Sequence, residues 1–468
     1  MPTKLELNPD RLFPVDPACR EIARSLYSRV AELPIISPHG HVDASLLLEN
    51  RQFSNPAELF VSHDHYITRL LHAAGADLGS LGAGSGVLVD PRAAWRVLSS
   101  NWDLFAGTSS GYWLTHEFAT LFDIELEPSA ETADALYDAI ASQLALDDYR
   151  PRSLFDRFRI DVLATTDDPM DDLAAHSALA TDPTFRGRVL PTFRPDAYLD
   201  PSAAGFAGRI SRLMEWAGEK PDDFSGYLRA LEGRRAYFIE RGAVSADHGV
   251  RQPFTVDLDE LDAARLFQGA VAGRLTPADS RVFAGHMLFQ MARMSTNDGL
   301  VMTVHPGVYR NHSSSTFDRL GPDTGHDIPI GVEYTQNLRP LLEEFGLNTN
   351  LHLVLFSVDE TVYSREVAPL AGFYPSVFVG APWWFLDAPD SIQRFRAAVT
   401  ETAGFYRGSG FIDDTRAFLS IPARHDMARR ADSAFLARLV GEGRVGRAQA
   451  ERIIVDLVDA IPRRVFKL

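Results

Sequence analysis

Short apolar runs recur along the 468-residue chain, and nearly all of them end in polar residues that can carry chemistry. The eight runs are 33–41, 160–168, 188–194, 242–248, 299–305, 351–357, 377–384 and 410–414. They are apolar nearly throughout and often β-branched, as in parallel strands buried on both faces. Several intervals between them carry a helical period: 278–294, 389–403 and 433–457, the last broken near 441–446. This alternation predicts an α/β protein with a (β/α)8 barrel.

The interval between the first two runs is much longer than the others. Parts of it, such as 56–73 and 132–144, have helical periodicity. A loop of this length without structure of its own is improbable. We therefore expect a large helical insertion after the first strand, at about 42–155, within a single barrel domain spanning residues 1–468. A separate small domain is the alternative.

The charge balance limits the kinds of partner that the chain can bind. The formal net charge is −17, which argues against nucleic acid because phosphate binding needs a basic surface. A small anionic substrate is compatible with this charge only where its site is locally basic. Arginines at the ends of the predicted strands therefore become informative.

Cysteine content and hydropathy narrow the chemistry and the location further. Cys19 is the single cysteine, so an internal disulfide and a cysteine-based zinc cluster are both excluded. A metal would have to use His and Asp or Glu. Residues 1–17 lack the apolar core of a secretory signal, and the strongest apolar stretch, 351–358, is too short to span a bilayer. We expect a cytoplasmic protein without membrane contact.

A metal site is predicted where the first and last runs end. In an extended segment His39 and His41 point the same way, and neutral imidazole is a common metal ligand. The last run ends in Asp413 and Asp414. Strands 1 and 8 are neighbours in a closed barrel, so a carboxylate would meet the two histidines and form a divalent-metal site. Alternatively, one of these aspartates caps the following helix.

This metal pattern resembles that of the amidohydrolase superfamily, and the wider sequence resembles the uronate (glucuronate) isomerases within it. One departure is Gly40, where the family segment has Cys between the two histidines. The resembling segments follow in family order between residues 33 and 430: Asp64–Tyr66, Thr165–Pro169, Phe193–Pro195, Ala246–Gly249, His305–Asn311, Trp383–Phe385, Asp414–Ser420 and Arg424–His425.

The resemblance implies a role for each matching position. His39, His41 and Asp414 would hold one divalent metal ion, usually zinc. Tyr66 would transfer the carbon-bound proton, and Asp414 would also shuttle a hydroxyl proton. Asp247 is a further substrate-site candidate because it follows the fourth strand. The remaining expected substrate contacts are Arg194, His305, Arg310, Trp383, Trp384 and Arg416.

The implied reaction is an aldose–ketose isomerisation of a small anionic sugar acid, D-glucuronate to D-fructuronate and also D-galacturonate to D-tagaturonate. It requires an acid or base within ~2.6–3.2 Å of the proton alpha to a carbonyl. A tyrosine, with an ordinary pKa near 10, would need nearby positive charge to act as that base. Arginine suits the uronate carboxylate because its planar fork matches a carboxylate in bidentate fashion.

Other interpretations compete with this one. Most amidohydrolases use metal-activated water, so the same His39, His41 and Asp414 would serve a hydrolase of a small acidic amide or lactone. A non-catalytic sugar-acid binding protein is the third hypothesis. Asp167 and Asp168 precede Pro169, so helix capping is at least as well supported for them as catalysis. For partners, we expect the sugar acid and further copies of this chain, as a homo-oligomer.

Overall fold

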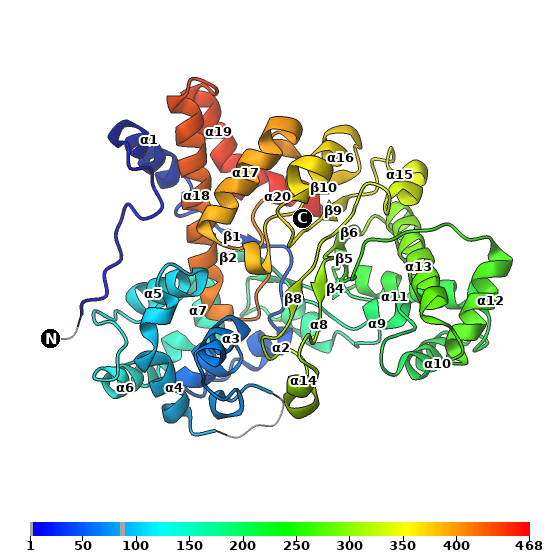
Figure 1. Ribbon diagram of the computed structural model, residues 1–468, viewed down its shortest axis with the longest axis horizontal. Coiled ribbons are helices and arrows are strands. Elements are labelled where there is room, and N and C mark those ends of the chain that lie inside the picture. Colours follow the sequence, from blue (N-terminus) through cyan, green and yellow to red (C-terminus); the bar gives the residue numbers. More distant parts are fainter. Residues whose placement is uncertain (1–2, 85–88) are drawn as a thin grey trace.

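The computed structural model describes residues 3–84 and 89–468, and parallel strands form its centre (Figure 1). The strands lie in two groups, each with its members in chain order. The first group contains β1 (Ile35–Ser37), β2 (Ile160–Ala164) and β3 (Arg188–Leu190). The second contains β4 (Thr192–Phe193), β5 (Ser245–His248), β6 (Val301–Val304), β9 (Leu353–Leu355) and β10 (Val377–Val379).

The two groups join because β3 and β4 are consecutive parts of the predicted run 188–194. Pro191 separates them, since proline has no N–H to give to the ladder. Beyond it, Thr192 O accepts a hydrogen bond from Asp167 N at 3.0 Å, so the run still follows β2. This one barrel strand therefore pairs with β2 on one side and with β5 on the other.

The eighth run closes the ring without becoming a regular strand. In the described chain, residues 410–414 contain no strand, which corrects the expectation for this run. Gly408 makes one parallel bridge to Val379, and His41 N donates to Thr415 O at 2.9 Å. Gly410 (φ +79°) and Asp414 (φ +40°) have left-handed backbones that cannot continue a strand. Eight segments thus follow one another in chain order, as in the predicted barrel.

Helices cover the outside of the strands (Figure 1). The predicted helices 389–403 and 278–294 are confirmed, and 433–457 is divided at residues 442–446. Among the described residues, no helix has the length and hydropathy needed to cross a bilayer. The helices outside the insertion are α1 (Pro17–Ser28), α8 (Ala174–Thr181), α9 (Asp196–Leu199), α10 (Phe206–Ala217), α11 (Phe224–Ile239), α12 (Glu260–Val271), α13 (Pro277–Asp298), α14 (Ser314–Leu320), α15 (Arg339–Phe345), η5 (Tyr363–Val367), α16 (Ala368–Phe373), η6 (Trp384–Leu386), α17 (Pro389–Ala403), η7 (Phe405–Arg407), η8 (Phe418–Ser420), α18 (Ile421–Gly441), α19 (Arg447–Val458) and α20 (Ala460–Phe466).

The long interval after β1 is helical, as predicted. Insertion residues Trp95 and Phe118 belong to the same buried apolar cluster as Ile35 of β1 and Leu163 of β2. This shared cluster supports a single domain, which stays a prediction. In Figure 1, α3 to α6 lie together at the lower left. The inserted helices are α2 (Ala44–Glu49), η1 (Glu58–Ser62), α3 (His65–Ala73), η2 (Gly79–Leu81), α4 (Pro91–Ser100), η3 (Trp102–Phe105), α5 (Ser109–Leu121), α6 (Ala133–Leu144), η4 (Asp147–Tyr149) and α7 (Pro151–Arg157).

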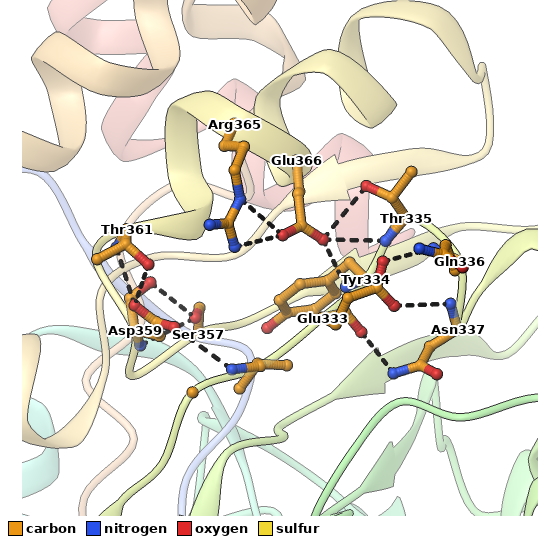
Figure 2. Close-up of polar contacts among 12 residues, drawn as sticks. Glu333, Tyr334, Thr335, Gln336, Asn337, Ser357, Asp359, Thr361, Arg365 and Glu366 are labelled. Carbon is orange, nitrogen blue, oxygen red and sulfur yellow. Dashed lines mark hydrogen bonds and ion pairs between the residues drawn. The ribbon is translucent and has the colours of Figure 1, made fainter.

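A long excursion between β6 and β9 is fixed to the barrel at its base. It contains the antiparallel pair β7 (Val308–Tyr309) and β8 (Ile328–Pro329), with α14 between them. Figure 2 shows how the returning chain is held, because the buried Glu366 carboxylate accepts Tyr334 N at 2.6 Å and Thr335 N at 3.0 Å. Arg365 pairs with the other oxygen of Glu366 at 2.6 Å. These contacts hold the chain that returns from the hairpin against the segment after β9.

Candidate metal and substrate site

A cavity of about 750 Å³ opens where the carboxyl ends of the strands meet. In (β/α)8 enzymes this end of the barrel carries the active site. All the site residues predicted from the sequence line the cavity: His39, His41, Tyr66, Arg194, Asp247, His305, Arg310, Trp383, Trp384, Asp414 and Arg416. The fold thus brings together residues that are up to 377 positions apart (39 to 416). Their individual roles stay predictions.

His39, His41 and Asp414, the residues of the predicted metal site, lie close together. Asp414 Oδ1 lies 3.0 Å from His41 Nε2 and 3.4 Å from His39 Nε2. The histidines leave β1 two residues apart, and the left-handed backbone at Asp414 turns its carboxylate towards them. A Cβ added at Gly40 would meet its neighbours at 3.5–3.6 Å, an ordinary contact, so this departure from the family pattern leaves the geometry intact.

The charges in this group suit a bound cation. Burial of His41 lowers its pKa, which favours the neutral imidazole that metals bind. Burial has the same tendency at His39, but the carboxylates of Asp247 and Asp414 outweigh it and raise the His39 pKa. Asp414 Oδ1 is buried and makes no hydrogen bond within the described residues. Two imidazoles and an unsatisfied carboxylate oxygen therefore fit a divalent metal ion.

Asp247 and His305 form a second polar group beside the first. Asp247 Oδ1 accepts from His305 Nδ1 and from the Thr303 hydroxyl, both at 2.6 Å. Burial works against the Asp247 carboxylate, but His305, His39 and Arg194 outweigh it and hold its pKa well below the usual range. His305 lines the cavity, and its Nε2 has no hydrogen-bond partner among the described residues. Together with His39 these residues form a second set with metal-ligand spacing.

The three arginines predicted from the sequence are among five that line the cavity, and they give it the local positive charge that an anionic substrate needs. Each of the three is paired with an aspartate that the sequence analysis did not single out. Arg194 contacts Asp196 at 2.9 Å, Arg310 contacts Asp327 at 3.0 Å, and Arg416 lies 3.7 Å from Asp323. Asp196 stands two residues after Arg194, and this spacing could have indicated an ion pair from the sequence. Asp323 and Asp327 lie on the hairpin between β7 and β8, where no sequence pattern marks them.

Tyr66 reaches the cavity from the first turn of α3. Asp64 caps this helix, and its Oδ1 accepts from Tyr66 N at 2.8 Å. Burial raises the pKa of Tyr66, while the nearby Arg424 guanidinium opposes that rise. Arg424 also lines the cavity. It belongs to a segment that carries the family resemblance, but its role was not foreseen, because it lies on α18 rather than at a strand end.

The structure also shows where the other polar residues of the predicted motifs lie. Asp413 accepts from His425 Nε2 at 3.0 Å and does not cap η8 or α18, the helices that follow it. Asp168 accepts from Met170 N at 2.9 Å, as a turn residue does, and does not line the cavity. His248 is fully buried and contacts Thr303 O. His65 lies on the cavity wall, where burial and the charge of Arg416 lower its pKa to about 3.

Comparisons with known proteins agree with this geometry. The family model described as glucuronate isomerase matches residues 17–466. The chain belongs to the glucuronate isomerase family. It is 53% identical to a uronate isomerase of Corynebacterium efficiens and 50% identical to one of Cutibacterium acnes, with at least 99% of each chain covered.

Solved structures of the same family share the fold. The glucuronate isomerase of Caulobacter crescentus superposes with a TM-score of 0.97 at 46% identity, over 99% of this chain and 98% of that one. The uronate isomerase of Thermotoga maritima gives a TM-score of 0.92 at 27% identity, over 98% of this chain and 99% of the other. The predicted family and fold class are therefore confirmed.

Proposed function

We propose that this protein is a metal-dependent uronate isomerase that interconverts D-glucuronate with D-fructuronate, and D-galacturonate with D-tagaturonate. The observation that carries the proposal is one cavity in which a His/Asp group with metal-ligand spacing lies together with Tyr66 and several arginines, Arg194, Arg310 and Arg416 among them. Membership of the glucuronate isomerase family and about 50% identity to uronate isomerases over the full chain support it. The hydrolase hypothesis shares the metal group, but nothing in the cavity favours it.

The metal ion would be held by His39, His41 and Asp414, and we propose Zn²⁺. Nitrogen and carboxylate ligands suit zinc, and three protein ligands leave a position open, as in catalytic sites. When bound, such an ion acts as a Lewis acid that polarises substrate oxygens and favours their ionised forms. Asp414 would both ligate the ion and shuttle a hydroxyl proton of the sugar.

The other residues would bind the sugar and move its carbon-bound proton. Arg194, Arg310 and Arg416 would hold the carboxylate, and Arg194 also contacts Asp247 at 3.4 Å. Tyr66 would take the proton from one carbon and return it to the neighbouring one. His305 Nε2 would accept from a sugar hydroxyl. Trp383 and Trp384 would exclude water from one side of the cavity.

Isomerisation can be tested directly by proton NMR. Purified protein supplied with zinc would be incubated with D-glucuronate or D-galacturonate in D2O. We expect the ketose to appear, and deuterium that enters the sugar would report how far the transferred proton exchanges with solvent. If neither sugar changes while metal is bound, the proposal fails, and cleavage of small acidic amides or lactones would then support the hydrolase hypothesis.

The role of Tyr66 has its own test. We expect Tyr66→Phe to keep its metal and to lower turnover by ~10²-fold or more, because general acid–base groups contribute effects of this size. Metal content would be measured by atomic absorption and turnover by the NMR assay. Near-normal turnover would remove Tyr66 from the reaction.

The proposal also covers the oligomeric state of the protein and its location in the cell. We infer a homo-oligomer that acts in the cytoplasm on a free sugar acid. Size-exclusion chromatography with light scattering would measure the assembly, and a monomer at micromolar concentration would contradict that part.

A further inference from the structure

Arg424 is a buried arginine that also lines the cavity. Its side chain is 3% exposed, at the start of α18. Nη1 donates to Asp387 Oδ2 at 2.7 Å, and Nε donates to the Ser420 hydroxyl at 3.1 Å. Its Cζ lies 3.6 Å from the ring centre of Trp113. The guanidinium is therefore held by two hydrogen bonds and by its contact with the indole ring.

The Arg424 guanidinium also lies near the tyrosine ring. Arg424 Cζ lies 5.5 Å from the ring centre of Tyr66, and both residues line the cavity. Within the described chain, Arg424 Nη2 makes no hydrogen bond. The Tyr66 ring is held by Trp113 on one side, with ring centres 5.6 Å apart, and by His65 on another at 4.8 Å. One indole thus contacts both the arginine and the tyrosine.

We propose that Arg424 is a positioning residue for Tyr66, which it holds at the cavity wall and whose phenolate it stabilises during proton transfer. The proposal rests on the proposed isomerase function and on the role of Tyr66 in it. The negative charge of a phenolate spreads into the ring, so a cation near the ring face stabilises it. Arginine suits this task because it stays charged when buried and stacks on an indole.

The charges near Tyr66 show what the arginine contributes. Burial raises the Tyr66 pKa, as do the carboxylates of Asp387, Asp414 and Asp64, whereas the Arg424 guanidinium lowers it. Arg69 also interacts electrostatically with Tyr66. Asp387 also fixes the arginine, and burial raises the pKa of that carboxyl to about 7 in spite of the pairing. His65 contacts the ring but is held neutral by its low pKa. Without Arg424, Tyr66 would lose the guanidinium that most strongly opposes the effect of burial on its pKa.

The test combines substitutions at both positions. We expect Arg424→Met to keep its metal and to lower kcat by ~10²-fold with KM changed less than about threefold, because the arginine acts in the proton-transfer step. The rising limb of the pH–rate profile should move to higher pH. Arg424→Lys keeps a charge and should retain more activity. In a Tyr66→Phe background neither substitution should cause a comparable further loss, since residues that act as a unit are non-additive.

Matched controls separate this role from folding and from substrate binding. Arg429 is also buried on α18, and among the described residues its side chain donates only to the carbonyls of Val30, Ala31 and Pro34. Arg429→Met therefore reports the cost of removing a buried arginine. If Arg424→Met does not fold, Arg424→Lys gives the same additivity test. A rise in KM with unchanged kcat, or losses that add to that of Tyr66→Phe, would overturn the proposal. A wild-type enzyme inactive on both uronates would overturn the proposed function as well.

Discussion

Asp414 is the residue on which the candidate metal site depends most. A single carboxylate oxygen lies within 3.4 Å of both imidazoles, and its pKa is well below the usual range because the contacts with His39 and His41 outweigh burial. Its left-handed backbone costs energy for a residue other than glycine, of order 1–3 kcal/mol. Such strain persists where the surroundings determine the conformation, and here the result is a ligand aimed at two histidines.

Removal of the His41 imidazole should therefore abolish most metal binding at the candidate site. We expect His41→Ala to bind less than about a tenth of the zinc of the wild-type protein, because the removed nitrogen is one of three protein ligands. His63 is the matched control, since it belongs to a second His-x-His pair but its side chain is 68% exposed. Dialysis against zinc followed by atomic absorption would measure both variants. Equal zinc content in the two variants would contradict the assigned ligand set.

The candidate site shows what residue patterns can and cannot predict. His39 and His41 could be predicted because an extended segment turns alternate side chains the same way, and Asp414 because the ends of a barrel meet. Asp323 and Asp327 could not, because their distance from Arg416 and Arg310 is set by a hairpin without a strand pattern. The family resemblance supplied Tyr66, which a helical pattern alone would assign to packing.

Among the elements, α3 controls where Tyr66 lies, and its N-cap can be tested. We expect Asp64→Ala to lower the free energy of unfolding by about 1 kcal/mol, because the orphan N–H groups of Tyr66 and Ile67 lose their acceptor. It should also lower kcat, since Tyr66 is the second residue of the helix. Urea unfolding and the NMR assay would measure the two effects.

A second capped helix of the insertion provides the control. Asp90 caps α4 through Arg92 N at 3.0 Å and does not line the cavity. Asp90→Ala should lose similar stability and keep its activity. If both variants kept full activity, the cap of α3 would have no part in placing the tyrosine.

The strands and helices were predictable to different degrees. Seven runs became strands because buried parallel strands have continuous apolar sequence. The eighth did not, because Gly410 and Asp414 adopt conformations that sequence periodicity does not reveal. The helix α17 has the predicted bounds, whereas the predicted 56–73 is divided by a break at residues 63–64. Because of that break, Asp64 becomes the N-cap of α3 and Tyr66 lies in the first turn of the helix.

At the scale of the whole molecule, the insertion and the barrel meet around a buried carboxyl group. Glu117 of α5 is 5% exposed. Burial and the charge of Asp64 raise the pKa of Glu117 to about 8, and Arg424 only partly opposes them. The composition of the chain could not predict this, because the burial of Glu117 depends on how the inserted helices pack against the segment that follows Asp414.

This carboxyl group should make the stability of the protein depend on pH. An unfolded glutamate titrates near ~4.3, so between about pH 4.3 and 8 the folded state binds one more proton than the unfolded state. The stability that Glu117 contributes is fully present below the unfolded pKa and is lost as pH rises through 8, by up to about 1.4 kcal/mol per pH unit.

The variant Glu117→Gln tests this, because glutamine stays neutral and the variant avoids that loss of stability. We therefore expect its urea midpoint to exceed that of the wild-type protein at pH 8 and to lie close to it at pH 5. The exposed Glu125→Gln should change neither midpoint. If the difference in urea midpoint between Glu117→Gln and the wild-type protein is the same at pH 5 and pH 8, Glu117 is ionised at both pH values. The insertion would then have to hold a buried negative charge beside Asp64.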